Sequence, residues 1–368
     1  MSRVRWAFGA CLCIPWALAA QGQIRIGQTV GVTGAVAATV KEASTGAMLY
    51  LDAVNARGGV GGEKIEVITL DDQFDTKRAA SNTRQLIEER QVVALFMSRG
   101  TPHTEGILPI LELHGVPLIA PSTGAMVLHT PVKKYVFNVR APYQREAEKA
   151  MAHLASIGIT RVAVVHVDDS FGADGLEGAQ RGLSTAKLAA VTIAKFDRSK
   201  PDFSQIVPVL AKTEPQAILF IGSGTAVVDG IKSVKEAGIS AQILTLSNNA
   251  SSGFVKLLGA QGHGIIVSQV MPQTMNYALV KEATQLAKGQ NISDLSPAML
   301  EGFAAAKVLV EALRRSGTKP TRASIQGALE GMHKLDIGGL EVSFSPTDHT
   351  GLDFSDLSII TAAGKFRR

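Results

Sequence analysis

The chain of 368 residues is 46% hydrophobic and 19% charged, a composition typical of a folded globular protein rather than a disordered one. At about 100–200 residues per domain, this length favours two domains. The net charge of +5 includes no block of lysine and arginine, which argues against a nucleic-acid partner. No apolar run reaches about 18 residues, so no stable insertion into a membrane is expected.

The first 20 residues have the pattern of a secretory signal peptide. Arg3 and Arg5 form a basic start, residues 7–18 are apolar, and small residues allow cleavage after Ala19 or Ala20. We therefore expect a periplasmic protein of a Gram-negative bacterium.

The only two cysteines, Cys11 and Cys13, lie inside this predicted signal. The mature protein is then expected to contain no disulfide and no thiolate metal site. No cofactor is expected either, and stability must come from the hydrophobic core.

From residue 24 onward, short β-rich runs alternate with longer amphipathic stretches. Strands are predicted at 24–30, 64–70, 92–97, 116–120, 162–167, 189–195, 217–221, 242–246 and 264–269. Helices are predicted at 42–56, 76–89, 101–114, 145–156, 171–185, 203–212, 226–237, 297–315 and 321–330, before a strand-rich tail at 335–344 and 357–361. This alternation of apolar strands with helices predicts an α/β fold with parallel sheets covered on both faces. The pattern restarts near Ala141-Pro142, where we place the first crossing between two lobes.

Two polar segments follow apolar strands. Residues 98–101 (Ser-Arg-Gly-Thr) follow the strand at 92–97, and residues 121–124 (Pro-Ser-Thr-Gly) follow the strand at 116–120. Each places hydroxyls and backbone N–H groups at the mouth of a parallel sheet, which suits an anionic ligand group. Capping of the next helix is the alternative interpretation, and the two roles use different atoms.

Motifs for catalysis are missing from the sequence. It contains no G-x-S-x-G nucleophile elbow and no H-E-x-x-H, and its eight histidines are scattered, so neither an enzyme nor a metal site is expected. The run 222–224 (Gly-Ser-Gly) lacks the third Rossmann glycine and is interpreted as a tight turn facing the cleft. Asp169 is interpreted as a helix cap that could also face the ligand.

Several segments together resemble a known family. They are residues 23–35, 53–59, 69–72, 115–117, 120–123, 169–172 and 202–204. They resemble the type 1 periplasmic binding proteins, in particular the branched-chain amino acid (Leu/Ile/Val) binding proteins of ABC transporters. The Asn-x-x-Gly-Gly element at 55–59 and the Asp71-Asp72 strand end are the most specific features.

The resemblance implies a fold of two Rossmann-like parallel-sheet lobes with three hinge crossovers. The signal peptide would cover residues 1–20. The N-terminal lobe would then comprise residues 21–140 plus about 271–332, and the C-terminal lobe about 141–270 plus 333–368. Such lobes close on a small ligand in the cleft between them.

The resemblance also implies a set of ligand contacts. Ser98 corresponds to a serine that meets a ligand carboxylate, and Phe171 corresponds to an aromatic that covers the ligand from the second lobe. Arg99 adds positive potential beside the head group. The full predicted set is Ser98, Arg99, Ser122, Thr123, Gly124, Tyr143, Phe171, Ser223 and Ser247.

The ligand class follows from a departure from the family pattern. Amino-acid binders usually carry acids near the positions of Tyr143 and Ser247, and neither residue is acidic here. A buried ammonium without a partner costs several kcal/mol. We therefore expect a carboxylate or other small polar compound without an α-ammonium, unless Asp169 or Glu105 replaces the missing acid.

The expected function is capture of a small polar organic ligand, amino acid-like or a carboxylate without an α-ammonium, in the periplasm and its delivery to the membrane permease of an ABC transporter. The protein is expected to act as a monomer. The alternative is a ligand-sensing protein of the same fold that acts on a receptor or regulator.

Overall fold

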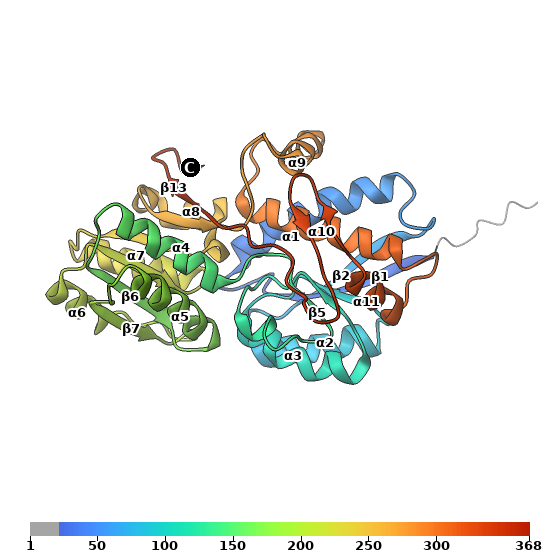
Figure 1. Ribbon diagram of the computed structural model, residues 1–368, viewed down its shortest axis with the longest axis horizontal. Coiled ribbons are helices and arrows are strands. Elements are labelled where there is room, and N and C mark those ends of the chain that lie inside the picture. The colour runs from blue at the N-terminus through green and yellow to red at the C-terminus, as the bar shows by residue number, and fades with distance from the viewer. Residues whose placement is uncertain (1–21) are drawn as a thin grey trace, which may run out of the picture.

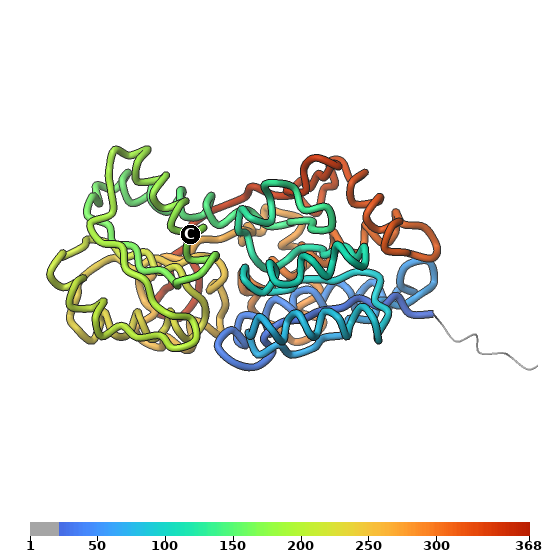
Figure 2. The backbone as a smooth tube through the Cα atoms, turned by 90° about the horizontal axis from the view of Figure 1, so that it is seen from below, coloured from blue at the N-terminus to red at the C-terminus, as the bar shows by residue number. Residues whose placement is uncertain are grey.

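The computed structural model describes residues 22–368, so the predicted signal peptide and its cysteines lie outside the described range. The chain forms two α/β lobes that lie side by side, as Figures 1 and 2 show. Within residues 22–368, no helix combines the length and the apolarity that a membrane crossing needs.

The first lobe contains a parallel sheet of five strands in the order β2-β1-β3-β4-β5. These strands are β1 (Gln23–Val30), β2 (Lys64–Asp71), β3 (Ala94–Phe96), β4 (Leu118–Ile119) and β5 (Val136–Phe137). Its helices are α1 (Ala37–Ala56), α2 (Thr76–Glu88), α3 (Thr101–His114), η1 (Met126–Leu128), α9 (Ala278–Gly289), α10 (Pro297–Arg315) and α11 (Arg322–Glu330). Helices α2 and α3 share one apolar cluster, whereas α1, α9, α10 and α11 share another, which shows that both faces of the sheet are covered.

Two glycines allow α1 and α10 to cross closely. A Cβ atom on Gly46 would lie 1.9 Å from the carbonyl oxygen of Met299, and one on Gly302 would lie 1.9 Å from that of Ala43. Only hydrogen fits at these two positions, because the opposing atoms belong to rigid helical backbone. The close crossing anchors the late helix α10 on the first lobe.

The second lobe contains seven strands in the order β14-β13-β10-β9-β8-β6-β7. They are β6 (Val162–Val167), β7 (Thr192–Phe196), β8 (Ala217–Ile221), β9 (Gln242–Thr245), β10 (Ile266–Gln269), β13 (Asp356–Ile360) and β14 (Phe366–Arg367). The helices are α4 (Tyr143–Ser156), α5 (Ser170–Thr185), α6 (Ile206–Thr213), α7 (Thr225–Glu236), η2 (Ser247–Asn249), α8 (Ser252–Leu258) and η3 (Gly259–Gly262). The strands from β7 to β10 are parallel, and β13 and β14 add antiparallel pairs at one edge. The expected α/β class with two parallel-sheet lobes is thus confirmed.

The tail divides between the lobes, which corrects the assignment of all of 333–368 to the second lobe. Strands β11 (Leu335–Asp336) and β12 (Glu341–Val342) form a separate two-stranded sheet. Apolar side chains from 337 to 352 join the core of the first lobe, and only β13 and β14 join the second sheet. The tail follows α11, which is already docked on the first lobe, so its first apolar residues are buried there.

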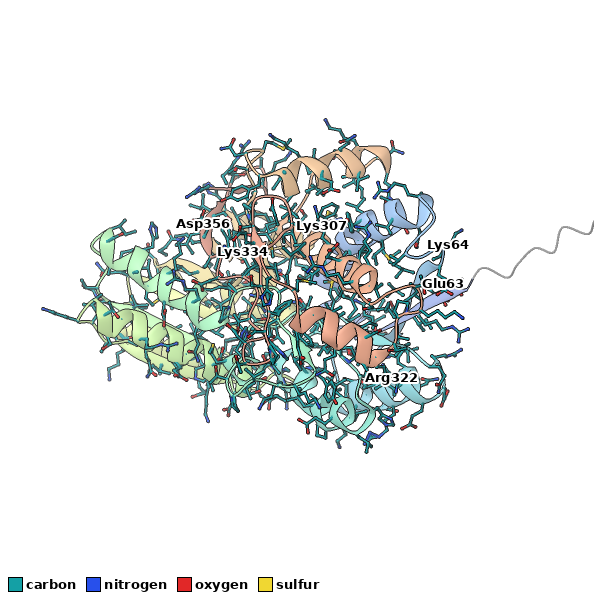
Figure 3. The ribbon with its side chains drawn as sticks, turned by 45° about the vertical axis from the view of Figure 1, so that its right-hand side comes forward. Glu63, Lys64, Lys307, Arg322, Lys334 and Asp356 are labelled. Atoms are coloured by element: carbon teal, nitrogen blue, oxygen red, sulfur yellow. The ribbon has the colours of Figure 1, made fainter. Side chains whose placement is uncertain are left out.

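Arg322 holds this late part of the chain on the first lobe (Figure 3). Its guanidinium donates to the carbonyl oxygens of Ile87 at 3.3 Å, Val92 at 3.2 Å and His114 at 3.2 Å. These carbonyls lie near the ends of α2 and α3, so the start of α11 is fixed against both helices.

The chain crosses between the lobes three times. The crossings follow β5, β10 and β12, and the first and third run side by side. The N–H of Gly351 donates to the carbonyl of Asn138 at 2.8 Å, and that of Leu352 to the carbonyl of Val139 at 3.0 Å. Three connecting segments, two of them hydrogen-bonded together, form the hinge.

Candidate functional site

A narrow cavity lies between the lobes, where turns after strands of both sheets meet. Its volume is about 10 Å³, roughly the room that one water needs. The residues that line it are Phe74, Arg99, Gly100, Thr101, Ser122, Tyr143, Phe171, Arg198, Ser223 and Asn248. The lobes meet closely around this cavity, and a wider interlobe pocket of about 610 Å³, lined among others by Asp169, adjoins it and shares Phe74, Arg198 and Ser223 with it.

Arg99 is the buried cation of this cavity. Its side chain sits in the turn between β3 and α3, where Gly100 takes a φ of 94°. One guanidinium nitrogen donates to Ser122 Oγ at 3.2 Å, and the other donates across the cleft to the carbonyl of Asn248 at 2.7 Å. Its Nε has no partner, and no carboxylate oxygen of residues 22–368 lies within 4.0 Å of the group. Burial lowers the pKa of this guanidinium.

Arg140, a second buried arginine, lies in the first crossing and is surrounded by acids. Its Nη2 pairs with Glu146 and donates to Ser247 Oγ at 2.7 Å, while its Nη1 lies 3.7 Å from Glu301. Burial lowers the pKa of the guanidinium, but the charges of Glu301, Tyr143 and Glu146 outweigh it and raise that pKa overall. This arginine is held by the protein itself.

The carboxylates near the cleft are already engaged. Glu146 is fully buried and accepts from the N–H of Ser247 at 2.9 Å, from its hydroxyl at 3.0 Å and from the hydroxyl of Ser268. Glu301 accepts from Ser122 Oγ at 3.4 Å, besides its contact with Arg140. Asp169, at the start of α5, is engaged as well.

Asp169 belongs to the second lobe, and it caps α5. Its carboxylate accepts from the N–H groups of Phe171 at 3.0 Å and Gly172 at 3.2 Å, and it pairs with Arg198 at 2.6 Å. The Arg198 guanidinium lies 4.9 Å from the ring of Phe74, which belongs to the first lobe. Asp169 therefore helps to place a contact between the lobes and does not face the cavity.

Two aromatic rings form the apolar wall of the cavity. Tyr143 begins α4, and its ring lies 4.6 Å from that of Phe171 at the start of α5. The Arg140 guanidinium lies 4.4 Å from the Tyr143 ring, and burial raises the pKa of the phenol. The Arg140 guanidinium is thus packed against the aromatic wall that Tyr143 and Phe171 form.

The structure brings five of the nine predicted site residues to the cavity. They are Arg99, Ser122, Tyr143, Phe171 and Ser223. Ser122 and Arg99 are neighbours through a parallel β-bridge, which follows from the side-by-side placement of β3 and β4. The polar segments that follow these two strands therefore do meet at one edge of the sheet, and their contact with a ligand stays a prediction.

The other four predicted residues do not line the cavity. Ser98 has its hydroxyl 3.4 Å from that of Thr104 on α3, and the Thr123 hydroxyl contacts that of Thr101 at 2.7 Å.

Gly124 and Ser247 lie beside the hinge instead. The carbonyl of Gly124 accepts from the N–H of Tyr143 at 2.8 Å, and Ser247 is enclosed by Arg140 and Glu146. In the structure these four residues contact other parts of the protein, and their direct contact with a ligand stays a prediction.

Five cavity residues were absent from the predicted set. They are Phe74, Gly100, Thr101, Arg198 and Asn248. Gly100 and Thr101 belong to the polar segment 98–101, and Arg198 follows β7. A search for polar residues directly after every predicted strand would therefore have found them. Asn248, two residues after the predicted strand at 242–246, carried the same signal, whereas Phe74 did not. Among residues 22–368, no three His, Cys, Asp or Glu side chains gather in a metal-binding arrangement.

Comparisons with known proteins place the chain in a family. Residues 23–355 match the family model described as Periplasmic binding protein. The chain belongs to this family, which gives it a substrate-binding role. A relative from Brucella melitensis, named Leu/Ile/Val-binding protein homolog 3, is 25% identical over 91% of this chain and 90% of its own length.

Solved structures agree with this assignment. A substrate-binding periplasmic protein from Ralstonia solanacearum is 30% identical, with a TM-score of 0.86 over 93% of this chain and 99% of that one. A branched chain amino acid ABC transporter protein from Thermus thermophilus with bound valine is 17% identical, with a TM-score of 0.82 over 94% of this chain and 95% of that one. The second likeness shows the shared fold alone.

Proposed function

We propose that this protein is the periplasmic binding component of an ABC importer and captures a small organic anion that lacks an α-ammonium. The two lobes close on the ligand, and the loaded protein delivers it to a membrane permease. The observation that carries the ligand class is the surroundings of Arg99.

A buried guanidinium without a carboxylate partner favours an anionic ligand. Arg99 is 4% exposed, and its hydrogen bonds go to a hydroxyl and a peptide carbonyl; Glu301 acts on it only as a nearby charge, without a contact within 4.0 Å. A ligand carboxylate would supply the missing charge, and charge-assisted bonds of this kind are about twice as strong as neutral ones. The hydroxyl of Ser122 lies beside the guanidinium, accepts from it and donates to Glu301.

The engaged acids argue against an ammonium ligand. Glu146 and Glu301 contact Arg140, and Asp169 pairs with Arg198. Glu105 accepts from the hydroxyl of Ser170 across the cleft. An α-ammonium would have to break one of the three ion pairs, be met by Glu105, whose partner is a hydroxyl, or remain buried without a partner at a cost of several kcal/mol.

Closure follows from contacts that a ligand makes with both lobes. Arg99 and Ser122 come from the first lobe, whereas Phe171, Ser223 and Asn248 come from the second. A ligand shifts the equilibrium between open and closed lobes only by its differential affinity for the two states. A carboxylate on Arg99 with its apolar part against Phe171 meets both lobes only when they are closed.

Calorimetry with matched ligand pairs tests the ligand class. Leucine is compared with 4-methyl-2-oxopentanoate, and phenylalanine with phenylpyruvate, because each pair differs only at the α-ammonium. In at least one pair, the oxo acid is expected to bind about 10²–10⁴ times more tightly, which corresponds to the 3–5 kcal/mol cost of an unpaired buried charge. Micromolar leucine binding that is as tight as oxo-acid binding would contradict the proposal.

Two further measurements test export and transport. The intact mass of periplasmic material should show cleavage after Ala19 or Ala20. A deletion strain should lose uptake of the bound acid. Normal uptake combined with a lost transcriptional response would favour the sensing alternative.

A further inference from the structure

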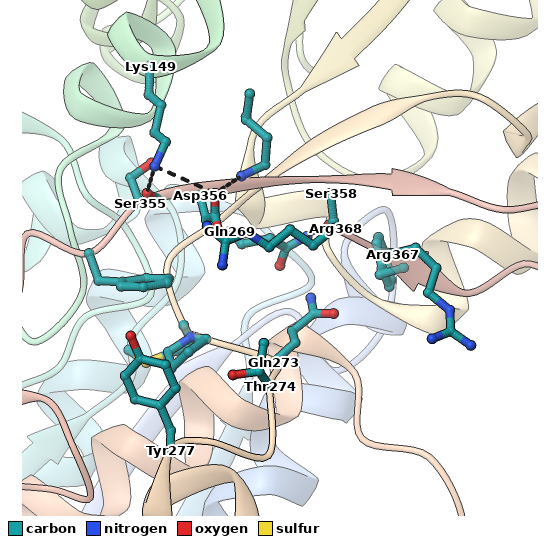
Figure 4. Close-up of a pocket in the computed structure, with 15 residues that line it drawn as sticks. Lys149, Gln269, Gln273, Thr274, Tyr277, Ser355, Asp356, Ser358, Arg367 and Arg368 are labelled. Atoms are coloured by element: carbon teal, nitrogen blue, oxygen red, sulfur yellow. Dashed lines mark hydrogen bonds and ion pairs between the residues drawn. The ribbon is translucent and has the colours of Figure 1, made fainter. Parts of the chain in front are cut away.

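A second pocket lies at the hinge and shares no lining residue with the cleft cavity. Its volume is about 460 Å³, within the range of roughly 300–1,000 Å³ typical of small-molecule sites. In Figure 4, Gln269 lies on one side of the pocket, and Gln273, Thr274 and Tyr277 lie on the other. We call it the hinge pocket and define it by Gln269, Gln273, Tyr277, Phe354, Arg367 and Arg368.

Both lobes and two of the three crossings contribute to this pocket. Gln269 ends β10 of the second lobe, and Tyr277 packs against the core of the first. Gln273 lies in the second crossing and Phe354 in the third. Because the walls belong to parts that move relative to each other, an occupant that fits one arrangement better would shift the lobes toward it.

Buried polar atoms in the hinge pocket lack partners. Gln269 is 2% exposed, and its amide nitrogen donates to Ser358 Oγ at 2.6 Å, whereas its Oε1 has no hydrogen bond. The Gln273 amide nitrogen and the Ser355 hydroxyl are also unpaired. Each such group costs about 1–3 kcal/mol when left unsatisfied. A ligand hydroxyl, which both donates and accepts, is able to satisfy either the acceptor on Gln269 or the donor on Gln273.

The hinge pocket is also lined by cations and by two aromatic rings. Lys149, Arg367 and Arg368 are its cations, and Asp356 pairs with Lys149 at 3.6 Å and with Arg368 at 2.9 Å. Among residues 22–368, Arg367 has no carboxylate within 4.0 Å. The rings of Tyr277 and Phe354 lie edge to face with their centroids 6.3 Å apart, and both supply apolar surface to the pocket.

We propose that the hinge pocket is a second ligand site, selective for a small aromatic carboxylate that carries a ring hydroxyl. The ring lies against Tyr277 and Phe354, the hydroxyl meets Gln269 and Gln273, and the carboxylate meets Arg367. The site is separate from the cleft cavity and shares no lining residue with it.

The test uses 4-hydroxybenzoate as the probe and the Arg99→Met variant as the protein, so that binding in the cleft is weakened. Calorimetry should show saturable binding below about 10 mM. Adding Arg367→Gln should weaken that binding about tenfold or more, because a charge-assisted bond is lost. Arg57→Gln, which removes an exposed arginine of the first lobe, is the matched control and should change nothing.

Further variants separate the pocket from general charge attraction. The uncharged isostere 4-hydroxybenzamide should bind about tenfold more weakly than the acid, and Gln273→Ala should weaken the acid but not benzoate, which has no ring hydroxyl. The proposal is overturned if Arg99→Met binds no 4-hydroxybenzoate up to about 10 mM, or if Arg367→Gln and Arg57→Gln have equal effects.

Discussion

Arg99 and Arg140 are both buried between the lobes, at 4% and 2% exposure, yet their surroundings differ. Arg140 lies in the hinge and contacts the carboxylates of Glu146 and Glu301. Arg99 lies at the end of β3 and contacts a hydroxyl and a carbonyl. The two arginines share size, charge and burial, so the difference lies in the partners that the fold supplies.

The comparison separates a structural cation from a binding cation. Carboxylates raise the pKa of Arg140 despite its burial, whereas burial dominates at Arg99 and lowers its pKa. A charge that is already compensated has nothing to gain from an anionic ligand, but an uncompensated one does. We therefore expect Arg140 to hold the hinge and Arg99 to meet the proposed anionic ligand.

The largest expected effect is on stability and comes from Arg140→Met. Removing this guanidinium leaves Glu146 and Glu301 near the hinge without their cation, which should lower the free energy of unfolding by about 3–5 kcal/mol. Urea denaturation measures the loss. Arg145→Met, which removes a 52% exposed arginine, should change stability by less than about 0.5 kcal/mol. A loss below about 1 kcal/mol at Arg140 would show that the acids do not depend on it.

The next effect is on affinity and comes from Arg99→Met. Binding of the acid identified by calorimetry should weaken about 10²–10³-fold, because the ligand carboxylate loses its cation. The free energy of unfolding should change by less than about 1 kcal/mol, since no protein carboxylate is left unpaired. A stability loss as large as that of Arg140→Met would remove the distinction between the two arginines.

Asp72 extends the comparison to an acid without a cation. It is fully buried, it accepts from Thr29 Oγ1 at 3.1 Å and from the N–H of Phe74 at 2.8 Å, and burial raises its pKa from 3.8 to about 6. Between these values the folded state binds more protons than the unfolded state, so the contribution of Asp72 to stability falls as pH rises toward 6 and is lost above it.

The Asp72→Asn variant should remove this part of the pH dependence. Buried His103 and His129, whose pKa values burial lowers to about 4, contribute the opposite slope, so the quantity to measure is the difference between variant and parent. In urea denaturation from about pH 4 to pH 7, the free energy of unfolding of the variant should rise relative to that of the parent as pH rises. A difference that is constant with pH would contradict the assignment.

The smallest expected effect concerns the contact of Arg198 with Phe74 across the cleft. Arg198→Gln should weaken ligand binding about two- to fivefold, because it removes a cation–π contact with Phe74 that contributes about 0.5–1 kcal/mol together with the ion pair to Asp169. Lys195→Gln is the control. Lys195 lies on β7 shortly before Arg198, and its substitution breaks only an exposed pair with Asp168, so affinity should stay unchanged. A loss above about tenfold would show that Arg198 shares the ligand anion with Arg99.

Regular elements were predictable where a local pattern fixes them. The predicted strand at 162–167 coincides with β6, and the helix at 297–315 coincides with α10. In both, the apolar spacing within one segment determines the structure. Helix α9 and the two-residue strand β5 were not predicted; β5 exists only through its pairing with β4.

The sequence by itself determined the α/β class, the two lobes and the sheet edge that carries Arg99 and Ser122, because periodicity and strand ends are local properties. The tertiary structure decided which of the two buried arginines has a carboxylate within 4.0 Å and which has not. Glu146 reaches Ser247 over 101 positions, and Glu301 reaches Ser122 over 179. Charge compensation in a closed cleft depends on such distant pairs, and no local pattern encodes which carboxylate will lie beside which guanidinium once the lobes meet.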